Sequence, residues 1–517
     1  MISQRYSRTR VEAVLLLVAW LLFLILALRA FGPDSVYSHF HSDGAIPILM
    51  ANDDHPINIF DTYYYAADRW GGWPLLIAKA LHLNFGLHWT DRSLHYVRTI
   101  WLFLGLLALA ALNARAAPAV IVSAFIVLCL ESTSRRLMFD LSQLYGWQLP
   151  ALFLAWFSLR QLLAARVHGI FWSAAFYFSA LFAIWSSVAS APLLAVLVIL
   201  EAIRFQKTIT KQRIGLAVVL LFAATASEFL LKKNYHRHSL KHFGNDFKTG
   251  MALDFGYFYE NLLTNWPNVV QYSFFPLIVV ALCFVVGTAG WILYTRVTGK
   301  GRIISLFEDE TIAMIIALTA MAAVNFALMI SVSHVRTSFY NVRFHALTYL
   351  FGAISGLLTI YLVIRFFANR MAMTRYVLPL VVTGAFIFLG VNFPPRTLSE
   401  TYKVDRQTAL ALSQKAPGAV LMGGYWETYL FAGLQPTNTM TPVPFEGVLN
   451  RIPWTTAILR DAQQVVIEYR NSGLVPKDSL PPNELSQHGN LLKLQEAHFY
   501  ENGPYAFALY FNERSKP

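Results

Sequence analysis

The residues best suited to chemistry lie between Pro33 and Pro74, directly after the first apolar run of the chain. A plain connector between two membrane helices needs only a few residues. The length and acid content of this stretch therefore indicate a site beside a membrane, facing a polar substrate carried by a lipid. Six aspartates are interleaved here with tyrosine, tryptophan and histidine: Asp34, Asp43, Asp53, Asp54, Asp61 and Asp68.

Asp43 is the first candidate for an acid–base role. It follows the apolar run 11–31 closely and lies between His41 and Gly44, so its carboxylate can stay near the membrane surface. A carboxylate in that place can take the proton of an acceptor hydroxyl, which is general-base chemistry. The alternative is that Asp43 caps a helix that begins at Gly44, a common role of aspartate. The residues alone leave both interpretations open.

Asp140 is a second candidate carboxylate. It lies in the predicted second outer loop, Ser132–Gln148, where it could face Asp43 across a cavity. The alternative is a local ion pair with Arg136, four residues earlier and therefore at helical spacing.

Two clusters of cations fall in predicted outer loops, where positive charge is normally avoided. An anionic ligand such as a lipid phosphate or diphosphate explains them, because arginine and lysine bind phosphate well. The alternatives are contact with anionic headgroups and a topology shifted by one span. The first cluster is Lys232, Lys233, His236, Arg237, His238, Lys241 and His242, and the second is His334, Arg336, Asn341, Arg343 and His345.

The sequence indicates no cofactor with any specificity. Asp53 and Asp54 leave a divalent metal open, although an Asn-Asp-Asp run before His55 and Pro56 favours an ordinary turn. There is no glycine-rich phosphate loop and no nucleophile elbow. The acidic triplet 308–310 is expected at the N-terminus of a helix, where acids are favoured.

Composition predicts a polytopic, all-α membrane bundle. Of the 517 residues, 56% are hydrophobic and 14% are charged, against about 25% charged in soluble domains. The net charge of +12 does not indicate nucleic acid, because the cations gather in short loops that set topology. Eleven apolar runs are expected to span: 11–31, 96–114, 117–131, 145–164, 170–187, 189–204, 214–231, 269–294, 311–332, 346–367 and 376–391.

The distribution of lysine and arginine predicts the orientation. Placing the N-terminus in the cytoplasm puts the larger share of the basic loop residues on the cytoplasmic side. The first loop, 32–95, and the tail then lie outside, which is the periplasm if the membrane is a bacterial inner membrane. In the first loop, Gly71 and Gly72 are expected to form a turn between interfacial helices, with Trp70 and Trp73 as interface anchors.

The chain divides into a membrane domain, 1–391, and a soluble domain, 392–517. From Arg396 the apolar runs give way to shorter patterns. Helices are expected at Ser399–Gln414 and Trp454–Ala462. Ala419–Met422 is a short apolar run that ends at Gly423-Gly424, and strands are expected at Val465–Glu468, Leu491–Leu494 and Tyr505–Phe511. Together these patterns predict a small α/β domain on the outer face of the membrane.

The chain resembles the GT-C superfamily of integral membrane glycosyltransferases. The resemblance is carried by an N-terminus-in first span, a long outer loop with an early aspartate in Ser42-Asp43-Gly44, basic later loops and a C-terminal outer domain. The sequence lacks the Asp-Glu pair of protein mannosyltransferases. Tyr425-Trp426-Glu427 also differs from the Trp-Trp-Asp motif of oligosaccharyltransferases. Modification of a glycan or lipid is therefore expected rather than of a protein.

The resemblance implies an inverting transferase that moves a sugar from a polyprenyl-phosphate donor to a periplasmic glycan or lipid acceptor. It assigns Asp43 as the base, whereas Asp140 remains a candidate from its loop position alone. It assigns Arg237, Lys241, Arg336 or Arg343 as phosphate ligands. The alternatives are a flippase or transporter of a lipid-linked glycan, which would need charges inside the spans, and a glycan polymerase or ligase of similar architecture.

Overall fold

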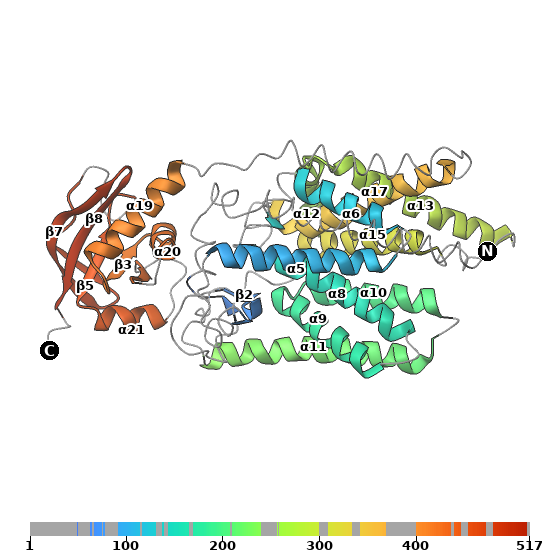
Figure 1. Ribbon diagram of the computed structural model, residues 1–517, viewed down its shortest axis with the longest axis horizontal. Coiled ribbons are helices and arrows are strands. Elements are labelled where there is room, and N and C mark those ends of the chain that lie inside the picture. Colours follow the sequence, from blue (N-terminus) through green and yellow to red (C-terminus); the bar gives the residue numbers. More distant parts are fainter. Residues whose placement is uncertain are drawn as a thin grey trace, which may run out of the picture.

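A computed structural model shows a bundle of long helices joined to a C-terminal sheet domain (Figure 1). The residues that the structure describes are 49, 63–64, 67–74, 76–77, 91–113, 116–130, 137–138, 143–164, 169–206, 209–238, 256, 258–298, 309–332, 342–368, 400–435, 439–445, 453–471 and 479–513.

Most helices of the bundle follow the predicted apolar runs, but α12 (Phe258–Val270) was not predicted, and the run 269–294 begins inside α12 instead of at the start of α13 (Phe275–Thr298). The runs 11–31 and 376–391 lie outside the described residues, so the total of eleven spans stays a prediction. Five described helices are long and apolar enough to cross a membrane. The helices are α5 Asp91–Ala111, α6 Ala117–Phe125 with the π-helical η2 Ile126–Leu130, α8 Tyr145–Ala164, α9 Gly169–Ser186, α10 Ser190–Phe205, α11 Lys211–His238, α12 Phe258–Val270, α13 Phe275–Thr298, α15 Glu310–Ile330, the 3-10 helix η5 Val342–His345 and α17 Ala346–Ala368.

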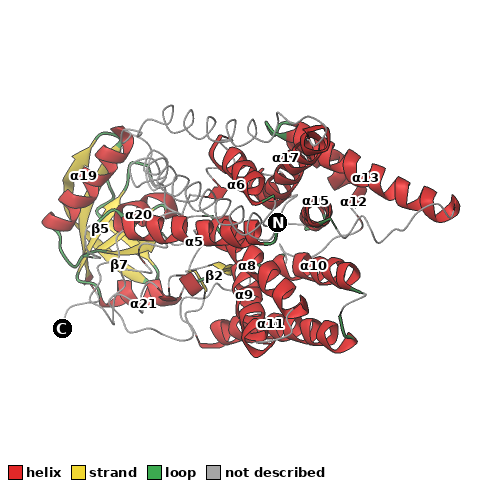
Figure 2. Ribbon diagram, turned by 45° about the vertical axis from the view of Figure 1, so that its right-hand side comes forward, coloured by secondary structure: helices red, strands yellow, loops and turns green. Residues whose placement is uncertain are grey.

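The core of the bundle is α8, whereas α11 and α13 present apolar side chains outward. Helix α8 packs against α5, α9 and α10, and Trp156 at its centre is fully buried. Helix α13 packs on α17 and α15 and otherwise stands at the edge of the bundle (Figure 2). Its Val286 is 68% exposed and its Val297 is 85% exposed. Contiguous apolar surface of this kind indicates contact with a membrane.

Helices α9 and α10 are separate, as the predicted polar break between them requires. The turn 187–189 divides them, and the Ser190 hydroxyl donates back to the carbonyl of Ala183 at 2.8 Å. Gln148 of α8 donates to the same hydroxyl at 2.8 Å. The two hydrogen bonds of the Ser190 hydroxyl therefore tie the break between α9 and α10 to α8, inside the bundle.

The described helices alternate in direction, so their polar ends collect in two layers. We call the end that holds the start of α5 and α8, the α9–α10 turn, and the junction between α15 and α17 the tail-side end, because the C-terminal domain lies beyond it (Figure 1). The opposite end, with the end of α8 and the start of α15, is the far end.

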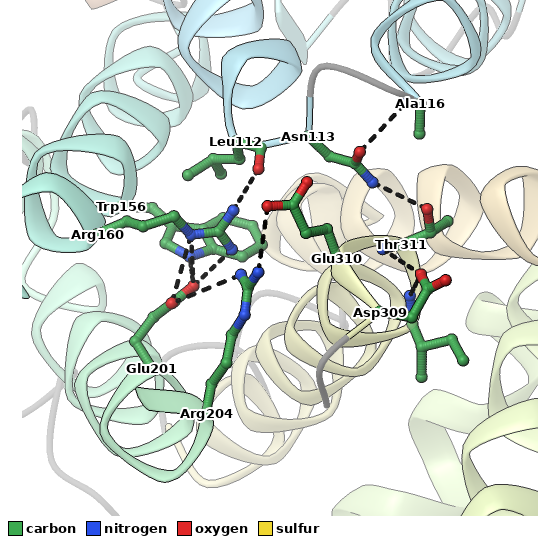
Figure 3. Close-up of polar contacts among 11 residues, drawn as sticks. Leu112, Asn113, Ala116, Trp156, Arg160, Glu201, Arg204, Asp309, Glu310 and Thr311 are labelled. Carbon is green, nitrogen blue, oxygen red and sulfur yellow. Dashed lines mark hydrogen bonds and ion pairs between the residues drawn. The ribbon is translucent and has the colours of Figure 1, made fainter. Parts of the chain in front are cut away.

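The far end is held by a network of ion pairs, of which the pair between Arg160 and Glu201 is buried (Figure 3). Glu201 of α10, 3% exposed, binds Arg160 of α8 at 2.7 Å and accepts from the Trp156 indole at 2.6 Å. Arg204 reaches Glu310 of α15 at 3.4 Å. These contacts tie α8, α10 and α15 together.

The start of α15 is a capped N-terminus, as predicted for the acidic triplet. The Asp309 carboxylate accepts from the backbone N–H of Thr311 at 2.8 Å and of Ile312 at 3.2 Å. Asn113, from the α5–α6 turn, donates to the Thr311 hydroxyl at 2.9 Å (Figure 3).

The tail domain is a six-stranded mixed sheet in the order β4-β3-β5-β8-β7-β6. Strands β4, β3 and β5 are parallel, and the others are antiparallel. Helices α19 and α20 contribute to the core on one face of the sheet and α21 to the core on the other. The elements are α19 Glu400–Lys415, β3 Val420–Gly423, α20 Tyr425–Gly433, β4 Thr441–Pro444, α21 Pro453–Asp461, β5 Gln464–Glu468, β6 Glu484–Gln487, β7 Asn490–Asn502 and β8 Tyr505–Asn512.

The α/β class of the tail is confirmed, and each predicted helix and strand has a counterpart in the structure. Strand β7 is longer than the predicted Leu491–Leu494, and β3 overlaps the predicted apolar run 419–422, which was not assigned to a strand. Elements α20, β4 and β6 were not predicted. Strand β4 carries Pro442 and Pro444, which argue against a central strand. The structure places β4 at the edge of the sheet, where proline is tolerated.

Candidate functional site

The described part of the first loop is fixed into the tail-side end of the bundle. Strands β1, Tyr63–Tyr64, and β2, Ala67–Gly71, form a short antiparallel hairpin. The Tyr63 hydroxyl donates to Oε1 of Glu228 on α11 at 2.8 Å. The Trp73 indole donates to the hydroxyl of Ser186 on α9 at 2.9 Å. The loop is thus joined to two helices, rather than lying loose on the surface.

Two expectations for this loop are wrong. Gly71 ends a strand instead of turning between helices, and a Cβ there would collide with the backbone carbonyl of Trp185. Trp73 is 4% exposed, so it is a core residue and not an interface anchor. Aromatic side chains serve both roles, and the sequence pattern does not distinguish them.

An aromatic cluster forms the centre of this end. Trp73 stacks on Phe182 with ring centroids 4.6 Å apart. It meets Trp101 edge-on at 5.4 Å and Trp147 at 6.0 Å. Stacked and edge-on aromatic pairs of this kind contribute stability beyond the apolar area that they bury. The first loop therefore rests on an aromatic base made by α5, α8 and α9.

Arg98 of α5 brings a positive charge into the same cluster. It is 1% exposed, its guanidinium carbon lies 5.5 Å from the Trp147 ring centroid, and Nη2 donates to the carbonyl of Gln143. A Cβ on Gly146 would collide with the guanidinium and with the Met138 carbonyl, so this approach needs glycine. Because arginine keeps its charge in proteins, the tail-side end permanently holds a cation.

Two buried polar atoms in the first turn of α8 have no hydrogen-bond partner among the described residues. They are the Trp147 indole nitrogen, a donor, and Oε1 of Gln148, an acceptor. The two residues are 3% and 1% exposed. Burial without a partner is costly, so a donor and an acceptor here can serve either the chain's own outer loops or a polar ligand.

Three features of this end were not among the predicted site residues: Arg98, Gln148 and the pair Tyr63–Glu228. The signal for Arg98 was an arginine at the start of an apolar run, within the predicted span 96–114. Charges inside spans often mark function, and that rule would have found both Arg98 and Glu228.

The structure describes two of the six predicted site residues, Arg237 and Arg343. Arg237 is exposed in the last turn of α11. Arg343 is half-buried in η5, with its guanidinium carbon 5.0 Å from the Phe344 ring centroid. Both belong to the tail-side end, but α11 and α17 lie on opposite sides of the bundle in Figures 1 and 2. Asp43, Asp140, Lys241 and Arg336 lie outside the described residues.

The two cationic clusters differ from expectation in detail. The predicted loop at 232–238 is wrong, because α11 continues to His238. The helix is extended by Tyr235, which is fully buried and lies 5.3 Å from the Tyr63 ring. His345 is also fully buried, between Phe326 at 5.4 Å and Tyr349 at 6.2 Å. It is a core residue and not part of a solvated cationic surface.

The first loop also contacts the tail domain. Leu49, six residues after Asp43 in the chain, is buried in the same apolar cluster as Tyr429 and Phe431 of α20. Val97, next to Arg98, packs against this cluster from α5. The loop, the start of α5 and the tail domain therefore meet at one place.

The described residues contain no group of three or more His, Cys, Asp or Glu side chains arranged to hold a metal ion. Asp53 and Asp54, the residues that left a metal open, are outside the described part of the chain. The metal question is therefore not tested by the structure.

Comparison with solved structures shows that the chain has a fold like that of an archaeal oligosaccharyltransferase, as the predicted resemblance requires at the level of fold. No known family profile matches the sequence. No curated protein matches it either.

The particular structures that resemble the chain are oligosaccharyltransferases and an ArnT. The oligosaccharyltransferase of Archaeoglobus fulgidus, tethered with an acceptor peptide containing the NVT sequon, is 11% identical with a TM-score of 0.50, over 88% of this chain and 69% of that chain. The archaeal oligosaccharyltransferase AglB from the same organism, in complex with an inhibitory peptide and a dolichol-phosphate, is 11% identical with a TM-score of 0.48, over 89% and 70%. ArnT from Cupriavidus metallidurans in the apo state is 13% identical with a TM-score of 0.42, over 98% and 99%.

Proposed function

We propose that this protein is a membrane glycosyltransferase that moves a sugar from a polyprenyl-phosphate donor to a glycan or lipid acceptor, with inversion. The observation that carries the proposal is the fixing of the first loop, through Tyr63 and Trp73, into the end of the bundle that also holds Arg98. The fold of an oligosaccharyltransferase supports it. The loop that carries the candidate base is thereby held beside cations that suit a phosphate.

In this proposal the acceptor hydroxyl attacks the anomeric carbon while the bond from that carbon to the phosphate oxygen breaks. Asp43 takes the hydroxyl proton, which makes the attacking oxygen a better nucleophile. The phosphate leaves with the bonding electrons and remains on the carrier. Attack from the face opposite the leaving phosphate inverts the anomeric centre. The proposed ligand that stabilises the phosphate is Arg237, Lys241, Arg336 or Arg343, and Asp140 is the proposed second carboxylate.

The proposed setting is a bacterial inner membrane, with the N-terminus in the cytoplasm and the tail-side end in the periplasm. The excess of lysine and arginine in the loops of the far end supports this orientation. The tail domain would then cover the site from outside, through its contact with Leu49 and Val97.

The experiment that tests the proposal is transfer by Asp43→Asn protein in lipid, with radiolabelled polyprenyl-phosphate sugars and a membrane glycan extract as acceptor. Asp53→Asn, in the same loop, is the matched control. We expect loss of transfer in Asp43→Asn and retention in Asp53→Asn, with both proteins folded. Full transfer by Asp43→Asn would remove the aspartate from the mechanism.

Transport of a lipid-linked glycan is the second candidate, because the helices bury more charge than expected. Arg98, Arg160 and Glu201 are each no more than 6% exposed, and buried charges in spans mark transport paths. The interlocked pairing of Arg160 with Glu201 favours a structural role at the far end. Movement of a fluorescent lipid-linked glycan across vesicle membranes, without transfer of its sugar, would favour the transporter.

A further inference from the structure

Helix α12, Phe258–Val270, has one apolar and one polar side. At about 100° per residue, Tyr259, Leu263, Trp266 and Val270 fall within an arc of about 60°. The opposite side carries polar residues: Glu260, Asn261, Thr264, Asn265 and Asn268.

The apolar side of α12 faces outward, and Asn261 of the polar side holds the helix to the protein, whereas Glu260 and Thr264 of that side are exposed. Tyr259 is 72% exposed, Leu263 57%, Trp266 51% and Val270 42%. Asn261 is 1% exposed and donates to the carbonyl of Ile330 at the end of α15, at 2.7 Å. This arrangement is the reverse of an amphipathic helix on a protein in water, which buries its apolar stripe.

The tail domain provides the internal comparison. In α19 the apolar residues Tyr402, Ala409 and Leu412 are buried against the sheet. Lys403 and Arg406 of the same helix are exposed. The same chain thus buries the apolar side of a helix in α19 and leaves it uncovered by protein in α12. We infer that the surroundings of the apolar side of α12 are apolar.

We propose that the face formed by Tyr259, Leu263, Trp266 and Val270 contacts bilayer lipid at the boundary between the headgroups and the acyl chains. Tyrosine and tryptophan are enriched at that level, because their rings are apolar while the O–H and N–H remain wet. The face is continuous with the outward apolar surface of α13, which follows after a turn of four residues. The Trp266 ring lies 5.5 Å from that of Phe275, the first residue of α13.

The lipid contact of α12 fixes how deeply the tail-side end of the bundle lies in the bilayer. Helix α12 packs against α15 and against η5, the segment that holds Arg343. The boundary of the bilayer then lies at the level of η5 and the end of α15. A cation at this level is within reach of headgroup phosphates.

The test measures depth with spin labels on Leu263→Cys and, as the matched control, Thr264→Cys. The two positions are adjacent and both exposed, but lie on the apolar and the polar side. Both variants are made in a background with Cys129 and Cys283 replaced by serine, and are reconstituted in vesicles of phosphatidylethanolamine and phosphatidylglycerol. Collision with oxygen reports lipid, and collision with a water-soluble nickel chelate reports water.

We expect the ratio of oxygen to nickel accessibility to be several-fold higher at Leu263 than at Thr264, with a depth within about 10 Å of the phosphate level. The ratio should not change when the protein is diluted with more lipid. Equal nickel accessibility at both positions would show that the face meets water. Low accessibility to both reagents at Leu263, or a ratio that falls on dilution, would show that protein covers it. Each of these results would overturn the proposal, and none depends on transfer activity.

Discussion

The Tyr63 hydroxyl and the Glu228 carboxylate, 165 positions apart in the sequence, form a hydrogen bond of 2.8 Å. It joins the first loop to α11 inside the tail-side end, where Glu228 is 6% exposed. A buried carboxylate depends strongly on its donors. We therefore expect this single hydrogen bond to contribute strongly to holding the first loop against α11.

Removing the Tyr63 hydroxyl should loosen the first loop. Tyr63→Phe takes a donor from a buried carboxylate, a change worth about 1–3 kcal/mol, and should lower the midpoint of thermal unfolding. Glu228→Gln keeps an acceptor for the tyrosine and should lower it less. Equal midpoints for wild type and Tyr63→Phe would show that the hydrogen bond does not hold the loop.

Gly146→Ala should displace Arg98. Its Cβ would occupy the place of the guanidinium, so we expect a loss of stability of about 1–3 kcal/mol, as in overpacked cores, together with reduced donor binding. Gly215→Ala in α11 is the matched control, because a Cβ there meets nothing within 4 Å. Unfolding midpoints and binding should separate the two variants. A harmless Gly146→Ala would contradict the close approach seen here.

Glu201→Gln should damage the far end much more than Glu310→Gln. The first leaves Arg160 buried without its carboxylate, which costs about 3 kcal/mol or more. The Glu310 side chain is 46% exposed, and exposed pairs contribute about 1 kcal/mol or less. Thermal unfolding in detergent compares the two. Similar shifts of the unfolding midpoint in both variants would mean that the buried pair of Glu201 with Arg160 contributes less stability than its geometry indicates.

Glu468 should make the tail domain less stable as pH rises. Burial, with a contribution from nearby Glu427, raises the pKa of its carboxyl from 4.5 to about 7. Between these values the folded domain keeps a proton that the unfolded chain has lost, so stability falls through this window and stays low above it. The full effect is about 3 kcal/mol.

Glu468→Gln removes that dependence. Hydrogen exchange of β3, β5 and β8, compared between variant and wild type at the same pH, should show equal protection at pH 5 and greater protection in the variant at pH 8. The comparison uses the full chain. Equal protection at both values would mean that the carboxyl titrates near its ordinary pKa.

The helices were predictable because a membrane demands long apolar runs. The run 145–164 coincides with α8, and the run 170–187 nearly coincides with α9. The extension of α11 was not predictable from apolarity, since it depends on the contact of Tyr235 with Tyr63, which is remote in sequence.

Only the end of the bundle was predictable for the candidate site. The described residues of the stretch 33–74 lie at the same end as the described cations of α11 and η5, whereas the site itself stays a prediction. The burial of Trp73 and His345, and the approach of Arg98 to Gly146, are set by packing between helices. Residue types and local spacing do not predict such contacts between separate helices.

The most direct test of the central claim is binding of a polyprenyl phosphate to the purified protein in lipid, titrated for wild type, Arg343→Ala and Arg237→Ala. The account predicts saturable binding by the wild type that is weakened at least tenfold in one of the variants, about 1.4 kcal/mol or more. Absence of saturable binding, or equal binding by all three proteins, would contradict it. The basic groups would then serve only as anchors for headgroups.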